Sequence, residues 1–81
     1  MDIENEVRQL AERVDEKTRT KLFEYIVLRE RLIALTGVEN PSEATLTDIL
    51  PIEDYAQRKL AGATAARMRR LIRETFPYLM E

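Results

Sequence analysis

The amino-acid sequence predicts an all-α protein, a compact bundle of four to five short helices whose last two form a helix-turn-helix-like pair. Charged residues make up 35% of the chain, and only two glycines and three prolines occur, a composition that favours helices. Apolar residues recur at helical spacing in several segments. No β-hairpin pattern and no internal repeat is present, so we expect a single helical domain over residues 1–81.

The length of the chain limits its hydrophobic core. A domain of 81 residues buries only about 60–65% of its unfolded surface. The sequence contains no cysteine for disulfides and no histidine, the commonest metal ligand, so neither a crosslink nor a metal is expected to compensate. Helix packing and self-association remain as sources of stability, and we expect a homodimer with two-fold symmetry.

Residues 1–37 are expected to form either one long helix or a helical hairpin. The apolar stripe stops at a run of six polar residues that begins at Asp15, although no glycine or proline interrupts residues 2–36. We favour a break near Asp15. The stripe spans under two heptads, which favours packing within the chain over a dimer seam. The stripe comprises Ile3, Val7, Leu10 and Val14, which follow one another at steps of four, three and four residues.

The segment from residue 21 to residue 36 is apolar on nearly all sides. A helix of this kind is either central in a bundle or shares one face with another chain, and we expect it to be central. Gly37 provides the helix stop, because glycine adopts the left-handed conformation at no steric cost. The apolar residues form a stripe of Tyr25, Leu28, Leu32 and Leu35, and a second of Leu22, Ile26 and Ile33, with Phe23 and Val27 beyond it.

A short helix is expected over residues 40–50. Asn40 can cap it, Pro41 suits its first position, and Glu43 can reach back to the cap. Pro51 is expected to end this helix, because proline disfavours helical geometry in the residue before it.

Residues 51–76 are expected to form the helix-turn-helix-like pair, followed by an apolar tail at residues 77–81. The first helix of the pair runs to about residue 61 and ends at Gly62. Thr64 caps the second, which runs from about residue 65 to residue 75, before Pro77.

The last helix carries the candidate nucleic-acid-binding residues. In the helix-turn-helix motif the start of the second helix enters the major groove and flanking cations neutralise phosphates. Thr64, Ala65 and Arg67, with Arg69 close by, are therefore expected to face base edges of double-stranded DNA, and the remaining cations to meet phosphates. The full candidate set is Arg58, Lys59, Thr64, Arg67, Arg69, Arg70 and Arg73.

The charge pattern leaves a second interpretation open. Residues 32–57 hold five acidic and no basic side chains, whereas residues 58–81 hold six basic ones. The arginines could pair with the acidic segment, and the net charge of −2 is not typical of a nucleic-acid-binding domain. The alternative function is a protein–protein interaction or structural subunit that uses the apolar 21–36 helix and the tail. The tail either docks on a partner or covers the open end of the bundle.

Enzymatic chemistry has few of its usual groups in this sequence. Without histidine and cysteine, the common pairs of nucleophile and base cannot form, and no carboxylate spacing indicates a metal or cofactor site. Arg29 and Arg31 ahead of Gly37 resemble the helix spacing of three-helix chorismate mutases. That resemblance implies further basic residues downstream, and residues 38–57 have none. We therefore expect a non-catalytic protein, first of all a DNA-binding regulator.

The location and the core can also be predicted. The first residues are acidic and polar, and the longest mostly apolar stretch is too short for a bilayer, so we expect a cytoplasmic protein that does not enter a membrane. Truncating Ile26 or Leu71 to alanine is expected to cost about 2–5 kcal/mol. The expected core residues are Leu22, Ile26, Ile33, Leu60, Met68, Leu71 and Ile72.

Overall fold

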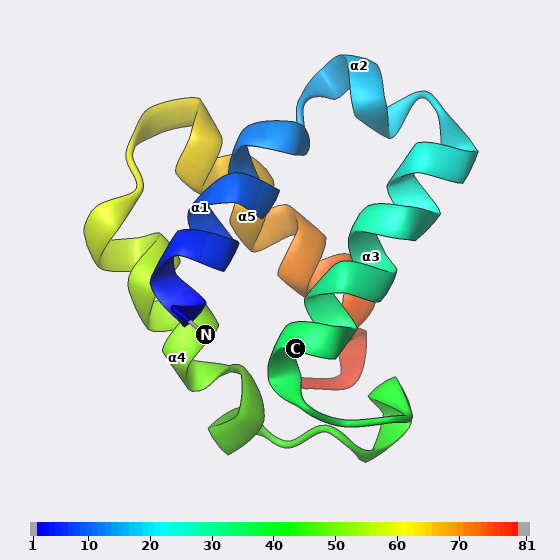
Figure 1. Ribbon diagram of the computed structural model, residues 1–81, viewed down its shortest axis with the longest axis vertical. Coiled ribbons are helices and arrows are strands. Elements are labelled where there is room, and N and C mark those ends of the chain that lie inside the picture. Colours follow the sequence, from blue (N-terminus) through cyan, green and yellow to red (C-terminus); the bar gives the residue numbers. More distant parts are fainter. Residues whose placement is uncertain (1, 80–81) are drawn as a thin grey trace.

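The computed structural model describes residues 2–79, without the side chains of residues 16 and 19, and this part of the chain is all-helical (Figure 1). The helical fold class predicted from composition and periodicity is confirmed. The elements are α1 (Ile3–Arg13), α2 (Glu16–Arg19), α3 (Leu22–Thr36), the 3-10 turn η1 (Pro41–Glu43), α4 (Leu46–Lys59), α5 (Gly62–Thr75) and the 3-10 turn η2 (Pro77–Leu79).

The first 36 residues form a helical hairpin with a short linking turn of helix, α2. Asp2 caps α1, since its carboxylate accepts the backbone N–H of Glu4 at 3.1 Å. Asp15 caps α2 in the same way, through the backbone N–H of Thr18 at 2.7 Å. The polar run that begins at Asp15 therefore turns the chain, and α1 and α3 pack against each other in opposite directions (Figure 1).

The prediction that Pro51 separates two helices is wrong, because α4 continues through this residue. The helix starts later than expected, at a capping pair in which the Asp48 carboxylate accepts the backbone N–H of Thr45 at 2.8 Å. Pro51 removes the hydrogen bond to the carbonyl of Thr47, but both residues are exposed, so water can solvate that carbonyl. The apolar face continues across the proline and offsets the loss through burial of Ile49, Ile52, Tyr55 and Ala56.

The connection between α4 and α5 is shorter than expected and fits the helix-turn-helix outline. Only Leu60 and Ala61 separate the two helices, and α5 begins at Gly62, ahead of the expected cap at Thr64. Gly62 has a φ of +58°, a conformation that other residues rarely adopt, and this permits the sharp turn. Leu60 packs partly buried against the core and so anchors the turn.

The core lies between α5, which packs against α1, α3 and α4, and α3, which packs against α1, α2, α4 and α5. The 21–36 helix thus contacts all the other α-helices of the described chain, but one of its sides is exposed. Met68, Leu71 and Ile72 of α5 are fully buried, as predicted. Ile33 and Leu60 are only partly buried, and Leu22 and Ile26 are exposed, in contrast to the prediction. The reason is that α3 turns its other stripe inward, and no described element covers the opposite face. The inward residues are Tyr25, Leu28 and Leu32.

The C-terminal segment folds back over one end of the bundle. Phe76 is fully buried, and Leu79 packs partly buried against the core. The Tyr78 hydroxyl donates to the carbonyl oxygen of Pro41 and lies 3.1 Å from that of Ala44. These contacts support the interpretation of the tail as a cover for the bundle up to Leu79; residues 80 and 81 lie outside the described residues.

No helix in the described part of the chain combines the length and the apolar character needed to cross a bilayer.

Candidate nucleic-acid interface

The outward side of α5 carries a basic strip, which we define as Ala66, Arg69, Arg70 and Arg73. All four residues are exposed, whereas the opposite side of the helix is buried in the core. At 3.6 residues per turn, these positions fall within one side of the helix, so the three guanidinium groups leave the same surface. The sequence-based candidates Arg69, Arg70 and Arg73 are thus brought together by the fold.

The ion pairs of the candidate cations are few and lie at the surface. Arg70 pairs with Glu74 at 3.1 Å, and Arg58 pairs with Asp54 at 2.8 Å, both at a spacing of four residues. Exposed pairs of this kind contribute about 0–1 kcal/mol each, so they leave both arginines available to a ligand of higher charge. Arg69 and Arg73 form no ion pair with any described side chain.

Arg58 and Lys59 are exposed at the end of α4, four and three residues before α5 begins at Gly62. Cations in the last turn of a helix also interact favourably with its dipole. Of the acidic residues in the 39–54 segment, only Asp54 pairs with one of these cations within the described structure. Pairing of the α5 arginines with that segment, the alternative that the charge pattern left open, is therefore absent from the described residues.

Thr64 and Arg67 lie to the side of the basic strip and are half-buried. Arg67 lies on the side of α5 that faces α2. There its charge helps to lower the pKa of the Asp15 carboxyl, after the larger contribution of the hydrogen bonds from Thr18. Arg67 therefore lies near Asp15, to the side of the basic strip that carries Arg69 and Arg73.

Acid is expected to weaken the fold through Asp15. Its pKa is lower in the folded than in the unfolded chain, so its contribution to stability is fully present above the unfolded value of about 3.9 and is lost as pH falls through the folded value. The Asp15→Asn variant keeps a capping oxygen but does not titrate. Urea midpoints of both proteins from pH 7 to pH 3 are expected to show a constant difference above about pH 5 that shrinks below about pH 4. A difference that does not depend on pH would contradict this assignment.

A polar network around Glu74 fixes the end of the basic strip against α3. The Tyr25 hydroxyl donates to one carboxylate oxygen of Glu74, and Arg70 donates to the other at 3.1 Å. Arg29 Nη2 also donates to the backbone carbonyl of Glu74 at 3.4 Å. Sequence reasoning missed this network, because it assigned Tyr25 to an apolar stripe and treated Glu74 only as part of the charge balance. The network orients Arg70 and ties the strip to the hairpin.

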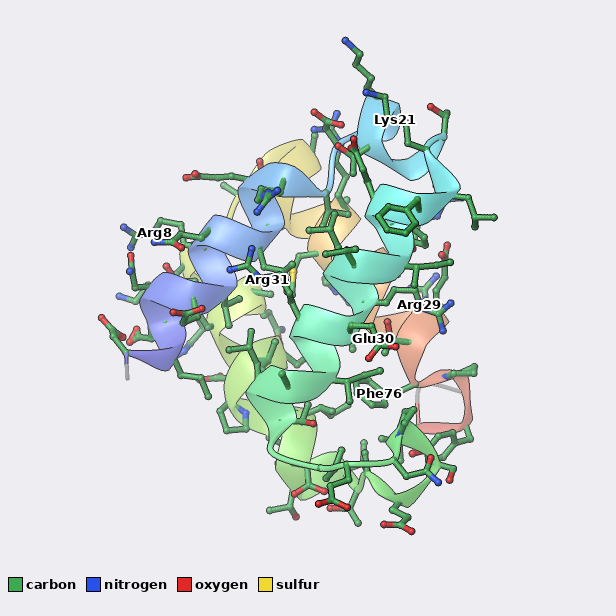
Figure 2. All side chains as sticks on the ribbon, turned by 45° about the vertical axis from the view of Figure 1, so that its right-hand side comes forward. Arg8, Lys21, Arg29, Glu30, Arg31 and Phe76 are labelled. Carbon is green, nitrogen blue, oxygen red and sulfur yellow. The ribbon has the colours of Figure 1, made fainter. Side chains whose placement is uncertain are left out.

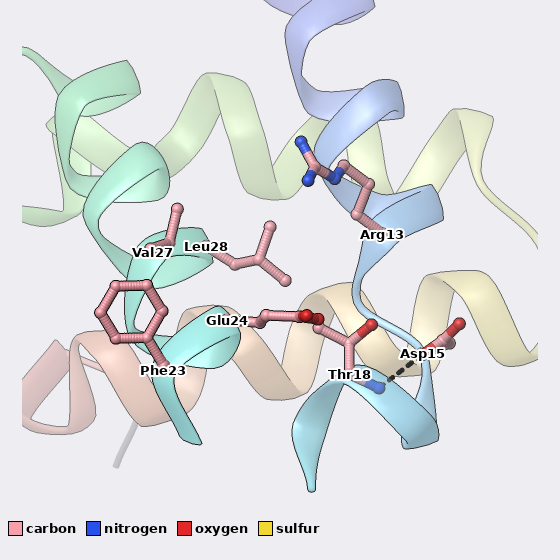
Figure 3. Close-up of a pocket in the computed structure, with 7 residues that line it drawn as sticks. All are labelled: Arg13, Asp15, Thr18, Phe23, Glu24, Val27 and Leu28. Atoms are coloured by element: carbon pink, nitrogen blue, oxygen red, sulfur yellow. Dashed lines mark hydrogen bonds between the residues drawn. The ribbon is translucent and has the colours of Figure 1, made fainter. Parts of the chain in front are cut away.

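A second unusual surface lies on α3, on the side that faces away from the core. Four neighbouring apolar side chains are exposed there, by 72% for Leu22, 79% for Phe23, 45% for Ile26 and 43% for Val27. We call these four residues the α3 apolar face. It borders a cleft of about 280 Å³, in which Phe23, Val27 and Leu28 lie opposite Arg13 and the Asp15–Thr18 cap (Figure 3).

Comparison with known proteins assigns no family. No family description, curated protein or solved structure matches this chain. Within the described residues, no group of three or more acidic side chains is placed to hold a metal ion. The basic strip and the α3 apolar face are therefore the features that indicate a function.

Proposed function

We propose that this chain is a non-catalytic DNA-binding protein, a small regulator that presents α5 to double-stranded DNA. The observation that carries the proposal is the basic strip, with three arginines on one exposed side of a helix and two of them without an ion pair among the described residues. Small side chains at the start of α5, Gly62, Ala63 and Ala66, are also exposed and leave room for close approach to a groove.

The placement of the side chains favours a division of roles. Arg69 and Arg73, one turn apart on the strip, contact the DNA directly. Lys59 and Arg58, on the adjacent end of α4, contact phosphates. Arg67 and Thr64, which lie to the side, have secondary roles. The net charge of −2 does not oppose this function, because binding responds to the local field of the strip rather than to the sum over the chain.

Binding to a mixed-sequence duplex at about 50 mM salt tests the proposal, because the electrostatic contribution is large there. Each phosphate contact contributes about −0.9 to the slope of log K against log salt, so we expect a slope of about −3 or steeper for the wild type. Arg69→Ala and Arg73→Ala are each expected to reduce the slope by about one unit. Fluorescence anisotropy of a labelled duplex at about 50, 100 and 200 mM salt measures both quantities.

Arg31→Ala is the matched control, since it removes the same charge from a position between α1 and α3, beside Glu6 and Leu10. It is expected to leave the slope unchanged. Absence of wild-type binding at about 50 mM salt and up to about 100 µM protein would contradict DNA binding, since even non-specific affinities usually exceed that level. Equal effects of Arg31→Ala and Arg73→Ala would contradict the role of the strip.

A protein-interaction function is the second candidate, and the α3 apolar face favours it. Exposed apolar side chains that adjoin one another mark interaction sites more often than isolated ones do. The tail, the other surface considered for this function, is held by Tyr78 and Leu79 against the bundle and is less accessible.

A further inference from the structure

We propose that Tyr25 of α3 is a positioning residue for DNA binding, because its hydroxyl holds Glu74 and Glu74 in turn holds Arg70 of the basic strip. In this role, which rests on the proposed DNA-binding function, Tyr25 does not touch the DNA. Among the buried residues of α3, Leu28 and Leu32 end in methyl groups, whereas Tyr25 carries a polar atom to the carboxylate of Glu74 on α5. The hydroxyl thus joins the core side of α3 to the basic strip.

The carboxylate of Glu74 divides its two oxygens between α3 and the basic strip. Oε2 accepts the hydroxyl of Tyr25, and Oε1 accepts the Nε–H of Arg70 at 3.1 Å. The backbone carbonyl of Glu74 also accepts from Nη2 of Arg29 at 3.4 Å, on the side where α3 meets α5 (Figure 2). Glu74 is therefore held from α3 through both its side chain and its backbone, so Arg70 is attached to a carboxylate of fixed position.

The geometry of the guanidinium group allows Arg70 to contact DNA while it remains bound to Glu74. The hydrogen bond to Glu74 comes from Nε–H, which is one of five N–H groups and the one nearest the backbone. The other four lie on the two Nη atoms at the tip of the side chain, which is 54% exposed. A phosphate that approaches from solvent thus meets the Nη atoms, whose planar fork suits two phosphate oxygens.

Fixing Arg70 before the DNA arrives lowers the entropic cost of binding. A flexible side chain that loses its rotamer freedom on binding weakens an interface about two- to tenfold. The pair of Arg58 and Asp54 provides a contrast, because no described side chain from another helix forms a hydrogen bond with Asp54. Its carboxylate is also more exposed, by 54% against 36% for Glu74. Arg70 is therefore the better ordered of these two arginines.

Replacing Tyr25 with phenylalanine tests the positioning role, because the substitution removes the hydroxyl and keeps the ring in the core. Tyr25→Phe is expected to weaken binding to a mixed-sequence duplex about threefold at about 50 mM salt, measured by fluorescence anisotropy. No charge is removed, so the slope of log K against log salt is expected to stay unchanged, in contrast to the effect of Arg73→Ala.

Tyr55→Phe is the matched control, since Tyr55 is a second buried tyrosine whose hydroxyl pairs with an arginine. Tyr55 lies on α4, and its hydroxyl accepts the Nε–H of Arg8 at 3.0 Å. Figure 2 shows Arg8 on the opposite side of the molecule from Arg29, and hence away from the network around Glu74. Tyr55→Phe is expected to leave DNA binding unchanged. Circular dichroism melts check that both variants remain folded.

A double-mutant cycle separates the positioning of Arg70 from a general effect on the fold. If Tyr25 acts through Arg70, Tyr25→Phe has no further effect in an Arg70→Ala background and keeps its full effect in an Arg73→Ala background. A merely structural role would weaken binding equally in both backgrounds, since Arg70 and Arg73 belong to the same helix.

The free chain provides a readout that needs no DNA. NMR signals of the arginine Nε–H groups report their exchange with water, and a hydrogen-bonded proton exchanges more slowly than an unbonded one. In the wild type, the Nε–H of Arg70 is expected to exchange more slowly than those of Arg69 and Arg73. Tyr25→Phe is expected to reduce this difference, and Tyr55→Phe to preserve it.

Stronger DNA binding by Tyr25→Phe would overturn the proposal, because Glu74 would then compete with phosphate for Arg70 instead of orienting it. Unchanged binding, an equal loss in the two arginine backgrounds, or equal exchange of the three strip arginines in the wild type would also overturn it. All of these results leave DNA binding by the wild type intact, so they are distinct from failure of the proposed function. Absence of wild-type binding would overturn both proposals.

Discussion

Leu71→Ala is expected to lower the free energy of unfolding by about 2–5 kcal/mol, because the side chain is fully buried on the inner side of α5. Alanine leaves a cavity where α5 meets the other helices, and the surrounding side chains can fill it only in part. A domain of this size has a total stability of about 4–12 kcal/mol, so the variant loses a large share of it. Urea denaturation followed by circular dichroism measures the change.

Ile26→Ala is the matched control and is expected to change the free energy of unfolding by less than about 0.5 kcal/mol. Both substitutions shorten an apolar side chain on a helix, but Ile26 is 45% exposed. The comparison requires a low protein concentration, since formation of the homodimer expected from the sequence would add to the apparent stability. Equal losses for the two variants would show that the outer face of α3 is covered in the monomer, contrary to the structure.

The difference between these two residues shows what the sequence could predict. The buried side of α5 was found correctly because the helix is strongly two-faced, with arginines opposite Met68, Leu71 and Ile72. The segment 21–36 is apolar all round, so helical periodicity alone gave no preference between its two stripes. Which stripe of α3 is buried depends on the side on which α1 and α5 pack. The contacts of α3 with these two helices join parts of the chain that are far apart in sequence.

The error at Pro51 has a similar origin. Local rules gave the correct helix stop at Gly37, which has a φ of +80°, and the correct end of α5 before Pro77. They failed at Pro51 because burial of residues on both sides of the proline offsets one lost hydrogen bond. Capping by Thr45 and Asp48 was a detectable signal for the start of α4. Asn40 and Pro41 do cap and begin a helical turn, as predicted, but that turn is the 3-10 turn η1 and not the start of the longer helix.

The candidate site was predictable in composition but not in geometry. The sequence identified the arginines of the last helix and the cations at residues 58 and 59. It did not predict that Arg67 lies near Asp15, or that Tyr25 and Arg29 of α3 hold Glu74. These contacts follow from the position of the hairpin beside α5, and they separate Arg69 and Arg73 from the other candidates.

Phe76→Ala is expected to have the second large effect, a loss of about 3–5 kcal/mol. The ring is fully buried at the end of α5, and the backbone N–H of Phe76 donates to the carbonyl of Ile72 at 2.9 Å. The ring therefore links the end of α5 and the start of η2 to the core. Since the expected loss approaches the total stability of a small domain, partial unfolding at 37 °C is the expected phenotype, measured by circular dichroism and amide exchange.

Tyr78→Phe separates the anchoring of the tail from the packing of the core. It removes the hydroxyl that donates to Pro41 and lies near Ala44, but it keeps the ring, so a loss of only about 0.5–1.5 kcal/mol is expected. Amide exchange in the variant is expected to rise in η1 and η2 and to stay unchanged in α5, because the hydroxyl holds the two turns together without contributing to the core. A large loss in Tyr78→Phe with a small one in Phe76→Ala would reverse the assigned roles. Similar small losses in both would mean that the segment after α5 does not cover the bundle.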